Sequence, residues 1–194
     1  MSALENSAAK AENGAAIIEI TAAKFLIKSI RFHESSNEDD SLDFRTSAVV
    51  AVLNFNGLTS EIAVSDVRAG NYDQVSFLVH KVAGNETPSD PDFVSGNNRY
   101  SSIIEGLYNG VPFVYRSAKT INQVVTFPSV LVVEDLPSTL NVTLQLDTAL
   151  WFVDNHGAQL NPTDTSNGNV AQIDQSIHRS FRVFRDTNRD GHSD

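Results

Sequence analysis

Cysteine is absent from this 194-residue sequence, which excludes disulfides, thiolate metal sites and cysteine nucleophiles. No apolar run approaches the roughly 18 residues that a membrane-spanning helix requires. The H-x-x-x-H and H-x-H spacings of zinc sites, the G-x-S-x-G elbow of hydrolases and glycine-rich phosphate loops are also missing. Basic residues are few, 14 against 24 acidic ones, and the net charge of −10 argues against nucleic acid as a partner.

The remaining composition is that of a chain that folds around a core. Hydrophobic residues make up 41% and charged residues 20%, and the length suits one large domain. Residues 1–14 are small and polar, so we expect a flexible tether there and a single domain over 15–194. No apolar segment of the signal-peptide type follows Met1, which leaves a cytosolic protein or the mature part of a secreted one.

Most of the chain has the pattern of β-strands. Segments rich in β-branched and aromatic residues recur at a spacing of about 8–12 residues, which is typical of a sandwich or barrel. Asn56-Gly57 and Asn109-Gly110 are hairpin signals, because both residue types accept positive φ. A helix over 21–30 competes with the first strand, since good helix formers occur there. The predicted strands cover residues 15–32, 47–55, 58–64, 74–82, 100–107, 111–117, 121–127, 131–133 and 140–146. Alternation predicts that the core includes Val75, Phe77, Val79, Ile104, Phe113 and Leu144.

The pattern changes near the C-terminus. Ile173, Ile177 and Phe181 follow one another at intervals of four residues, which predicts a helix over about 170–182. The expected fold is therefore mainly β: an antiparallel β-sandwich of about seven to nine strands, with one C-terminal helix that leads into a calcium-type loop.

That loop carries the sharpest motif, D-x-N-x-D-G-x-x-D. Alternate side chains at its first, third and fifth positions can converge on one hard cation, the glycine at position six permits the turn, and the seventh residue offers its carbonyl. The predicted Ca²⁺ ligands are Asp186, Asn188, Asp190, the backbone carbonyl of His192, and Asp194. The segment before the loop resembles the entering helix of an EF-hand or dockerin-type loop.

The chain ends at loop position nine, so the acidic twelfth position of an EF-hand has no counterpart. Water or the acidic loop over residues 34–43 is expected to supply the missing oxygens. The alternative is that the segment is a solvated polar tail.

Two other sites remain open from the residues alone. Trp151 is a candidate platform for stacking a sugar, against the alternative of a plug at one end of the sandwich. A pair of catalytic carboxylates is recognised only by its spatial separation, so a hydrolase with an acidic cleft stays an alternative.

Several segments together resemble a family of uncharacterised bacterial cell-surface lipoprotein domains. They are residues 66–75 (DVRAGNYDQV), 102–113 (SIIEGLYNGVPF), 150–152 (LWF), and the stretch from 173 to 181 that runs into the acidic loop. The resemblance implies a secreted, lipid-tethered sandwich of transthyretin-like or immunoglobulin-like type. It implies no reaction and no catalytic residues.

The function expected is that of a non-enzymatic secreted or cell-surface binding or assembly module, stabilised by Ca²⁺ at its C-terminal loop. A carbohydrate-binding module and a hydrolase are the alternatives. The expected location is the cell envelope or the extracellular space. The expected partners are calcium ion, a glycan or another envelope protein, and further copies of the chain. Membrane contact is expected only through an N-terminal lipid anchor that this sequence does not contain.

Overall fold

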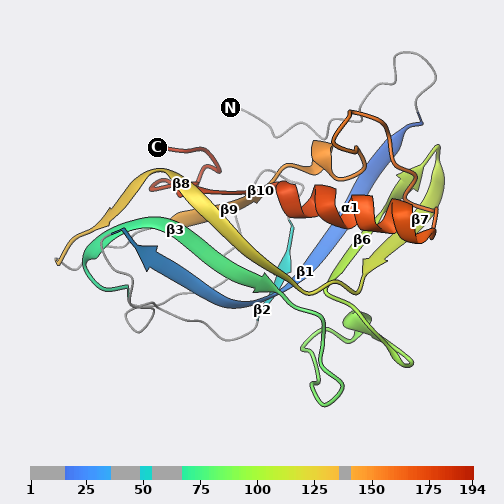
Figure 1. Ribbon diagram of the computed structural model, residues 1–194, viewed down its shortest axis with the longest axis horizontal. Helices are drawn as coiled ribbons and strands as arrows, with labels where there is room; N and C mark the ends of the chain where they lie inside the picture. The colour runs from blue at the N-terminus through green and yellow to red at the C-terminus, as the bar shows by residue number, and fades with distance from the viewer. Residues whose placement is uncertain (1–15, 36–48, 54–66, 136–140) are drawn as a thin grey trace.

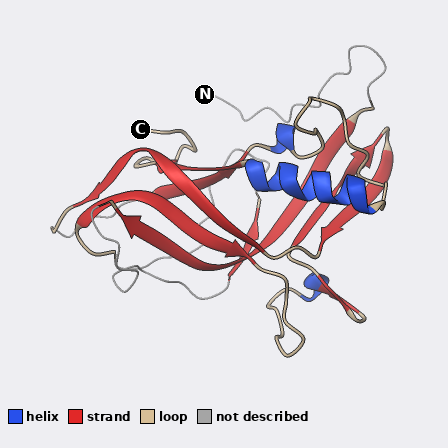
Figure 2. Ribbon diagram, viewed as in Figure 1, coloured by secondary structure: helices blue, strands red, loops and turns tan. Residues whose placement is uncertain are grey.

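The computed structural model describes residues 16–35, 49–53, 67–135 and 141–194. Strands make up 50% of these residues and helices 13%, and the sheets are antiparallel, with ten strands and one α-helix near the C-terminus (Figure 2). The mainly β fold predicted from the sequence is confirmed. The predicted tether over 1–14, the Asn56-Gly57 hairpin and the acidic loop from Ser36 onward lie outside the described residues.

Six strands form the main sheet, in the order β7-β6-β1-β3-β8, with β2 paired to β1. Their bounds are Ile18–Glu34 (β1), Val49–Val52 (β2), Gly70–Val79 (β3), Ser102–Tyr108 (β6), Val111–Ser117 (β7) and Ile121–Val133 (β8). The predicted β6–β7 hairpin is confirmed, since Asn109 and Gly110 both have positive φ, at 52° and 79°.

The 17-residue strand β1 organises the sheet. Its first half pairs with β6 and its second half with β3. The two neighbours meet at Leu26, whose amide donates to the carbonyl of Ser101 (2.9 Å) and whose carbonyl accepts from the amide of His80 (2.8 Å). The helix considered over 21–30 is therefore wrong, because sheet pairing and burial of the β-branched and aromatic side chains outweigh the local helix propensity.

The helix α1 (Asn167–Arg179) lies across β1, β6 and β7 (Figure 1). Its Ile173 and Ile177 join the largest hydrophobic cluster, together with Trp151, which follows the 3₁₀ turn η3 (Thr148–Leu150). Of the six predicted core residues, Leu144 is half-buried and packs against the largest hydrophobic cluster. The remaining five are buried. No helix among the described residues is both long and apolar enough to cross a bilayer.

The helix ends earlier than predicted. Phe181 belongs to the strand β10 (Phe181–Arg185), which pairs with β9 (Val142–Leu146) in a second, two-stranded sheet. Ser180 terminates α1, because its amide and its hydroxyl both donate to the carbonyl of Ile177. Phe181, Val183 and Phe184 then become buried, and the two arginines of β10 stay exposed.

The opposite face of β1 carries a smaller cluster. The chain between β3 and β6 leaves the main sheet and forms the 3₁₀ turn η2 (Pro91–Phe93) and the short hairpin β4–β5 (Val94–Ser95 and Asn98–Arg99), seen below the sheet in Figure 2. Phe93 is fully buried there against Leu26, Val82 and Ile103. Both faces of β1 are thus covered near Leu26.

Candidate functional site

The predicted calcium loop begins at the end of β10 with a buried carboxylate. Asp186 has no solvent-exposed surface. Its Oδ1 accepts a hydrogen bond from the amide of Asp190 (3.0 Å), and its Oδ2 accepts from the amide of Gly191 (3.0 Å) and from the hydroxyl of Thr143 (2.6 Å). Three donors therefore stabilise this carboxylate in the fold.

The chain then turns tightly around the amide of Asp190. That amide also donates to Oδ1 of Asn188 (3.1 Å), and Oδ1 of Asp190 accepts from the amide of His192 (2.9 Å). Arg189 and Gly191 have positive φ, 60° and 82°, so the glycine is at a position where other residues are strained. The structure thus brings three of the five predicted ligands, Asp186, Asn188 and Asp190, close together.

Asp194 closes the loop onto its own first residues. Its carboxylate accepts a hydrogen bond from the amide of Thr187, and its amide donates to the carbonyl of Arg185 (3.2 Å). Hydrogen bonds from the side chain and the amide of Thr187 hold the pKa of Asp194 below its usual value. In the described part of the chain, no group of three or more His, Cys, Asp or Glu side chains is arranged to hold a metal ion.

Asn141, just before β9, also holds the loop through hydrogen bonds. The sequence analysis did not identify this residue. Its carbonyl accepts from the amide of Asp186 (3.0 Å), and its side-chain nitrogen donates to the carbonyl of Thr187 (3.2 Å). Its side-chain oxygen accepts from Nε of Arg189 (2.8 Å). Asn141 lies 48 positions before Arg189, so no local spacing could have signalled the contact.

Of two expectations about the surroundings of this loop, one is wrong and the other stays a prediction. The chain enters the loop from the strand β10 and not from a helix, so the likeness to an EF-hand entering helix is wrong. Of the acidic loop expected to supply further oxygens, Glu34 is the last residue of β1 and pairs with Tyr72. Residues 36–43 lie outside the described residues.

Trp151 is a core residue. Its side chain has no exposed surface, its ring packs edge-on against Phe25 with centroids 5.7 Å apart, and its Nε1 donates to the hydroxyl of Ser180 (2.8 Å). A stacking platform must be exposed, so the sugar-binding role considered for Trp151 is wrong: the residue is buried in the main hydrophobic cluster.

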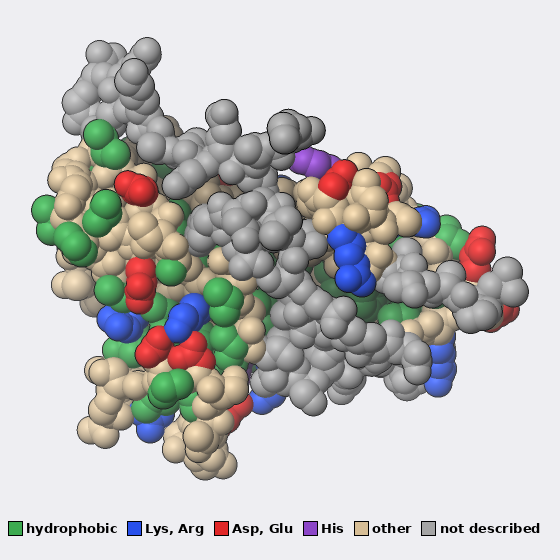
Figure 3. All heavy atoms as spheres, turned by 180° about the vertical axis from the view of Figure 1, so that it is seen from behind, with side chains coloured by type: hydrophobic (Ala, Val, Ile, Leu, Met, Phe, Trp, Pro, Cys, Tyr) green, Lys and Arg blue, Asp and Glu red, His purple; other side chains and the backbone are tan. Residues whose placement is uncertain are grey.

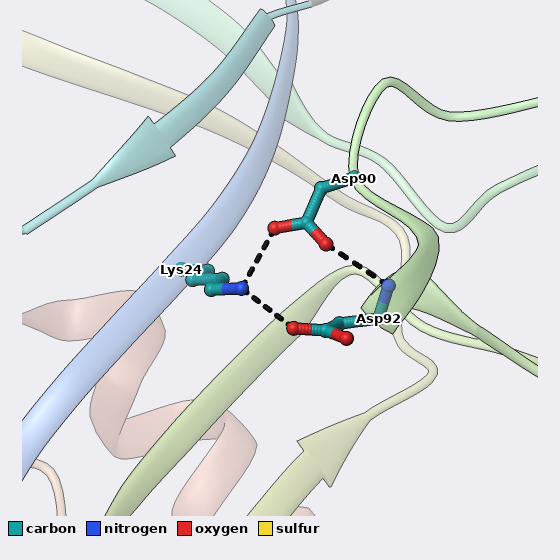
Figure 4. Close-up of polar contacts among 3 residues, drawn as sticks. All are labelled: Lys24, Asp90 and Asp92. Atoms are coloured by element: carbon teal, nitrogen blue, oxygen red, sulfur yellow. Dashed lines mark hydrogen bonds and ion pairs between the residues drawn. The ribbon is translucent and has the colours of Figure 1, made fainter.

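A pair of carboxylates from Asp90 and Asp92 does occur, on the face of β1 opposite α1 (Figure 4). The ammonium group of Lys24 lies between them, 2.8 Å from Asp90 and 2.6 Å from Asp92. The two hydrogen bonds raise the pKa of Lys24 far above its usual value, and the bond from Lys24 lowers the pKa of Asp90. These two ion pairs hold η2 against β1. A glycosidase uses its two carboxylates in separate roles, whereas here one lysine pairs with both.

Seen from behind, the surface has acidic, basic and hydrophobic side chains next to one another (Figure 3).

Comparisons with known proteins found no relationship: no family model, no curated protein and no solved structure matches this chain.

Proposed function

We propose that the chain is a non-enzymatic binding or assembly module of the cell surface, whose C-terminal loop binds Ca²⁺ and is stabilised by it. The observation that carries the proposal is the gathering of Asp186, Asn188 and Asp190 around a single turn with positive φ at Arg189 and Gly191. Oxygen atoms from such a set are the ligands that Ca²⁺ prefers. The carbonyl of His192 and one oxygen of Asp194, with water, complete the proposed set.

Calcium binding would offset electrostatic repulsion within the loop. Three carboxylates follow the strand β10 within nine residues, and their mutual repulsion is relieved when a divalent cation binds between them. We propose weak binding in the range of extracellular modules, with a Kd of about 10⁻⁴ M. Millimolar calcium outside cells would fill such a site, and this agrees with the cell-surface location that the resemblance implies.

Exposed valines support a role in binding or assembly. The two outer strands of the main sheet carry large hydrophobic side chains that face solvent: Val111 and Val114 on β7, and Val124, Val130 and Val132 on β8. Exposed apolar residues on outer strands are where other chains or partners attach. The proposed partners are a glycan, another envelope protein or further copies of this chain.

The test is thermal melting in chelator, in ~1 mM Ca²⁺ and in ~1 mM Mg²⁺. At a Kd of about 10⁻⁴ M, ~1 mM Ca²⁺ adds about 1.4 kcal/mol to the free energy of unfolding, which raises the melting temperature by a few degrees. Mg²⁺ should do less, because it requires a tighter octahedron. Asp190→Ala should abolish the calcium shift, and Glu105→Gln on the exposed side of β6 should retain it.

Calorimetry at millimolar Ca²⁺ provides the second readout. An absence of binding heat together with an unchanged melting temperature would mean that the loop is a solvated tail that does not bind Ca²⁺. A calcium shift of equal size in Asp190→Ala would place the ion elsewhere on the chain.

A further inference from the structure

A small cavity of about 10 Å³ lies between α1 and the main sheet, close to the volume that one water molecule needs. Its wall combines apolar side chains with Ser101, Ser102 and Ser117 from the sheet, and with Asp174 and His178 from α1. The three serines and Asp174 are buried. His178 is half-buried, so it places a titratable ring beside this small cavity.

The two nitrogens of the His178 ring have different surroundings. One hydrogen-bonds the backbone of Asn122 in β8, and this bond favours the protonated nitrogen, so the ring donates it. The other, Nε2, is buried and has no hydrogen-bond partner. The backbone carbonyl of His178 accepts from the side chain of Gln123, also in β8, at 2.6 Å. His178 thus links the last turn of α1 to the start of β8.

Among the residues lining the cavity, Asp174 is the one other charged group. Its Oδ1 accepts from the hydroxyl of Tyr115 in β7 (2.8 Å). Burial and the nearby carboxylate raise the pKa of Tyr115 far above its usual value, so it stays a neutral donor. The main sheet contributes only hydroxyl and apolar side chains to the cavity lining, and the backbone of Asn122 is its polar contact with the ring.

Desolvation is the largest influence on His178 and lowers its pKa, although the hydrogen bond to Asn122 acts in the opposite direction. A position in the last turn of a helix also favours a cationic ring, but here the net direction is downward. The neutral ring is the form that the fold accommodates.

We propose that His178 is a pH-sensitive latch, whose neutral ring holds the C-terminal end of α1 on β8 and whose protonation releases it. Protonation places a charge and a second N–H, at Nε2, beside a largely apolar cavity. The unfolded chain takes up this proton below its ordinary pKa of about 6.5, while the folded chain does so only at lower pH. Stability from this group is therefore complete above about pH 6.5 and falls as the pH decreases toward the folded pKa.

The test compares urea unfolding from pH 8 to pH 5 for the unchanged chain, for His178→Asn and for the control His156→Asn. Asparagine keeps a donor near the position of Nδ1 but does not titrate, and His156 is exposed. Below about pH 6.5 the unfolding equilibrium constant of the unchanged chain should rise relative to His178→Asn by up to tenfold per pH unit. His156→Asn should follow the unchanged chain. Parallel pH profiles for the unchanged chain and His178→Asn would overturn the proposal.

Hydrogen exchange locates the effect and does not depend on the variant folding. In the unchanged chain, amide protection in α1, corrected for intrinsic exchange rates, should fall between pH 7.5 and 5.5 by more than protection in β6. An NMR titration of the His178 ring should show a pKa below the ordinary value of about 6.5. Uniform loss of protection, or a His178 ring that titrates at or above this value, would contradict the latch.

Discussion

Trp151 brings a polar atom into the centre of the core, and its environment shows how the fold accommodates that atom. The indole N–H donates to Ser180, and the hydroxyl of Ser180 donates in turn to the carbonyl of Ile177. The hydroxyl therefore satisfies the core tryptophan and ends α1 at the same time. Ser180 itself has no exposed surface.

Removing the Ser180 hydroxyl tests how much it contributes to stability. Ser180→Ala leaves the indole N–H buried without an acceptor, which should lower the free energy of unfolding by about 1–3 kcal/mol. Ser129→Ala, at an exposed position in β8, should change it by less than about 0.5 kcal/mol. Urea titrations followed by the fluorescence of the single tryptophan measure both. Equal stability of the two variants would show that Trp151 finds another acceptor.

Single residues were predictable from the sequence where alternation decides burial. Phe77 in β3 is 2% exposed, as its place in an alternating strand indicated. The sequence does not decide the role of Trp151, because one tryptophan after a short turn has no periodic context. Asp174 was not predicted as a buried group, since its acceptance of a hydrogen bond from Tyr115, 59 positions away, has no local signal.

At the scale of elements, close contact between β1 and β6 depends on Gly106. A Cβ atom at this position would lie 2.1 Å from the backbone oxygen of Glu19, next to the irregularity in pairing between Ile20 and Ala22. Backbone cannot move aside as a flexible side chain can, so the glycine allows the two strands to approach at this register. At Gly84, by contrast, an added Cβ would meet nothing within 4 Å.

The two glycines form a matched pair. Gly106→Ala should reduce the free energy of unfolding by about 3 kcal/mol or more, because β1 or β6 must shift to relieve the overlap. Gly84→Ala should leave it unchanged or raise it by up to about 1 kcal/mol, through lower entropy of the unfolded chain. Denaturant unfolding followed by circular dichroism distinguishes the two. A loss at Gly106 no greater than that at Gly84 would mean that the strands are not in close contact there.

Element types near the C-terminus show what local patterns can and cannot decide. Ile173 and Ile177 correctly indicated a helix, and the same spacing wrongly included Phe181. Residues 181–185 also suit a strand, since three of the five are aromatic or β-branched. Pairing with β9 selects the strand, and β9 is about 40 positions away in the chain. Tertiary pairing therefore decided a boundary on which the local signals conflicted.

At the scale of the whole molecule, the C-terminal segment is tied to the main sheet and to β9. Tyr115 of β7 contacts α1, Gln123 of β8 contacts the end of α1, and Thr143 of β9 contacts the C-terminal loop. Composition and strand spacing predicted a single β-rich fold. They could not predict which strands pair, because β1 meets β6 across about 80 residues and only the folded sheet defines that register.

These ties predict that two acids of the same loop act on stability in different ways. Asp186 is buried, and its carboxylate accepts from three donors, so Asp186→Asn turns an amide NH₂ toward groups that also donate. We expect a loss of about 2–3 kcal/mol in the free energy of unfolding even in chelator. Asp190 is exposed, and Asp190→Ala should cost less than about 1 kcal/mol in chelator.

Calcium then separates the two roles. If the loop binds the ion as proposed, ~1 mM Ca²⁺ should stabilise the unchanged chain but neither variant. The difference in free energy of unfolding between the unchanged chain and Asp190→Ala should therefore widen when calcium is added. Urea unfolding of the three proteins, each in chelator and in calcium, gives the six free energies of unfolding that this comparison needs. If Asp186→Asn matches the unchanged chain in chelator, Asp186 does not anchor the loop to β9. If Asp186→Asn is weakened but calcium has no effect on any of the three proteins, the loop is a structural closure of the β9–β10 sheet, stabilised by hydrogen bonds alone.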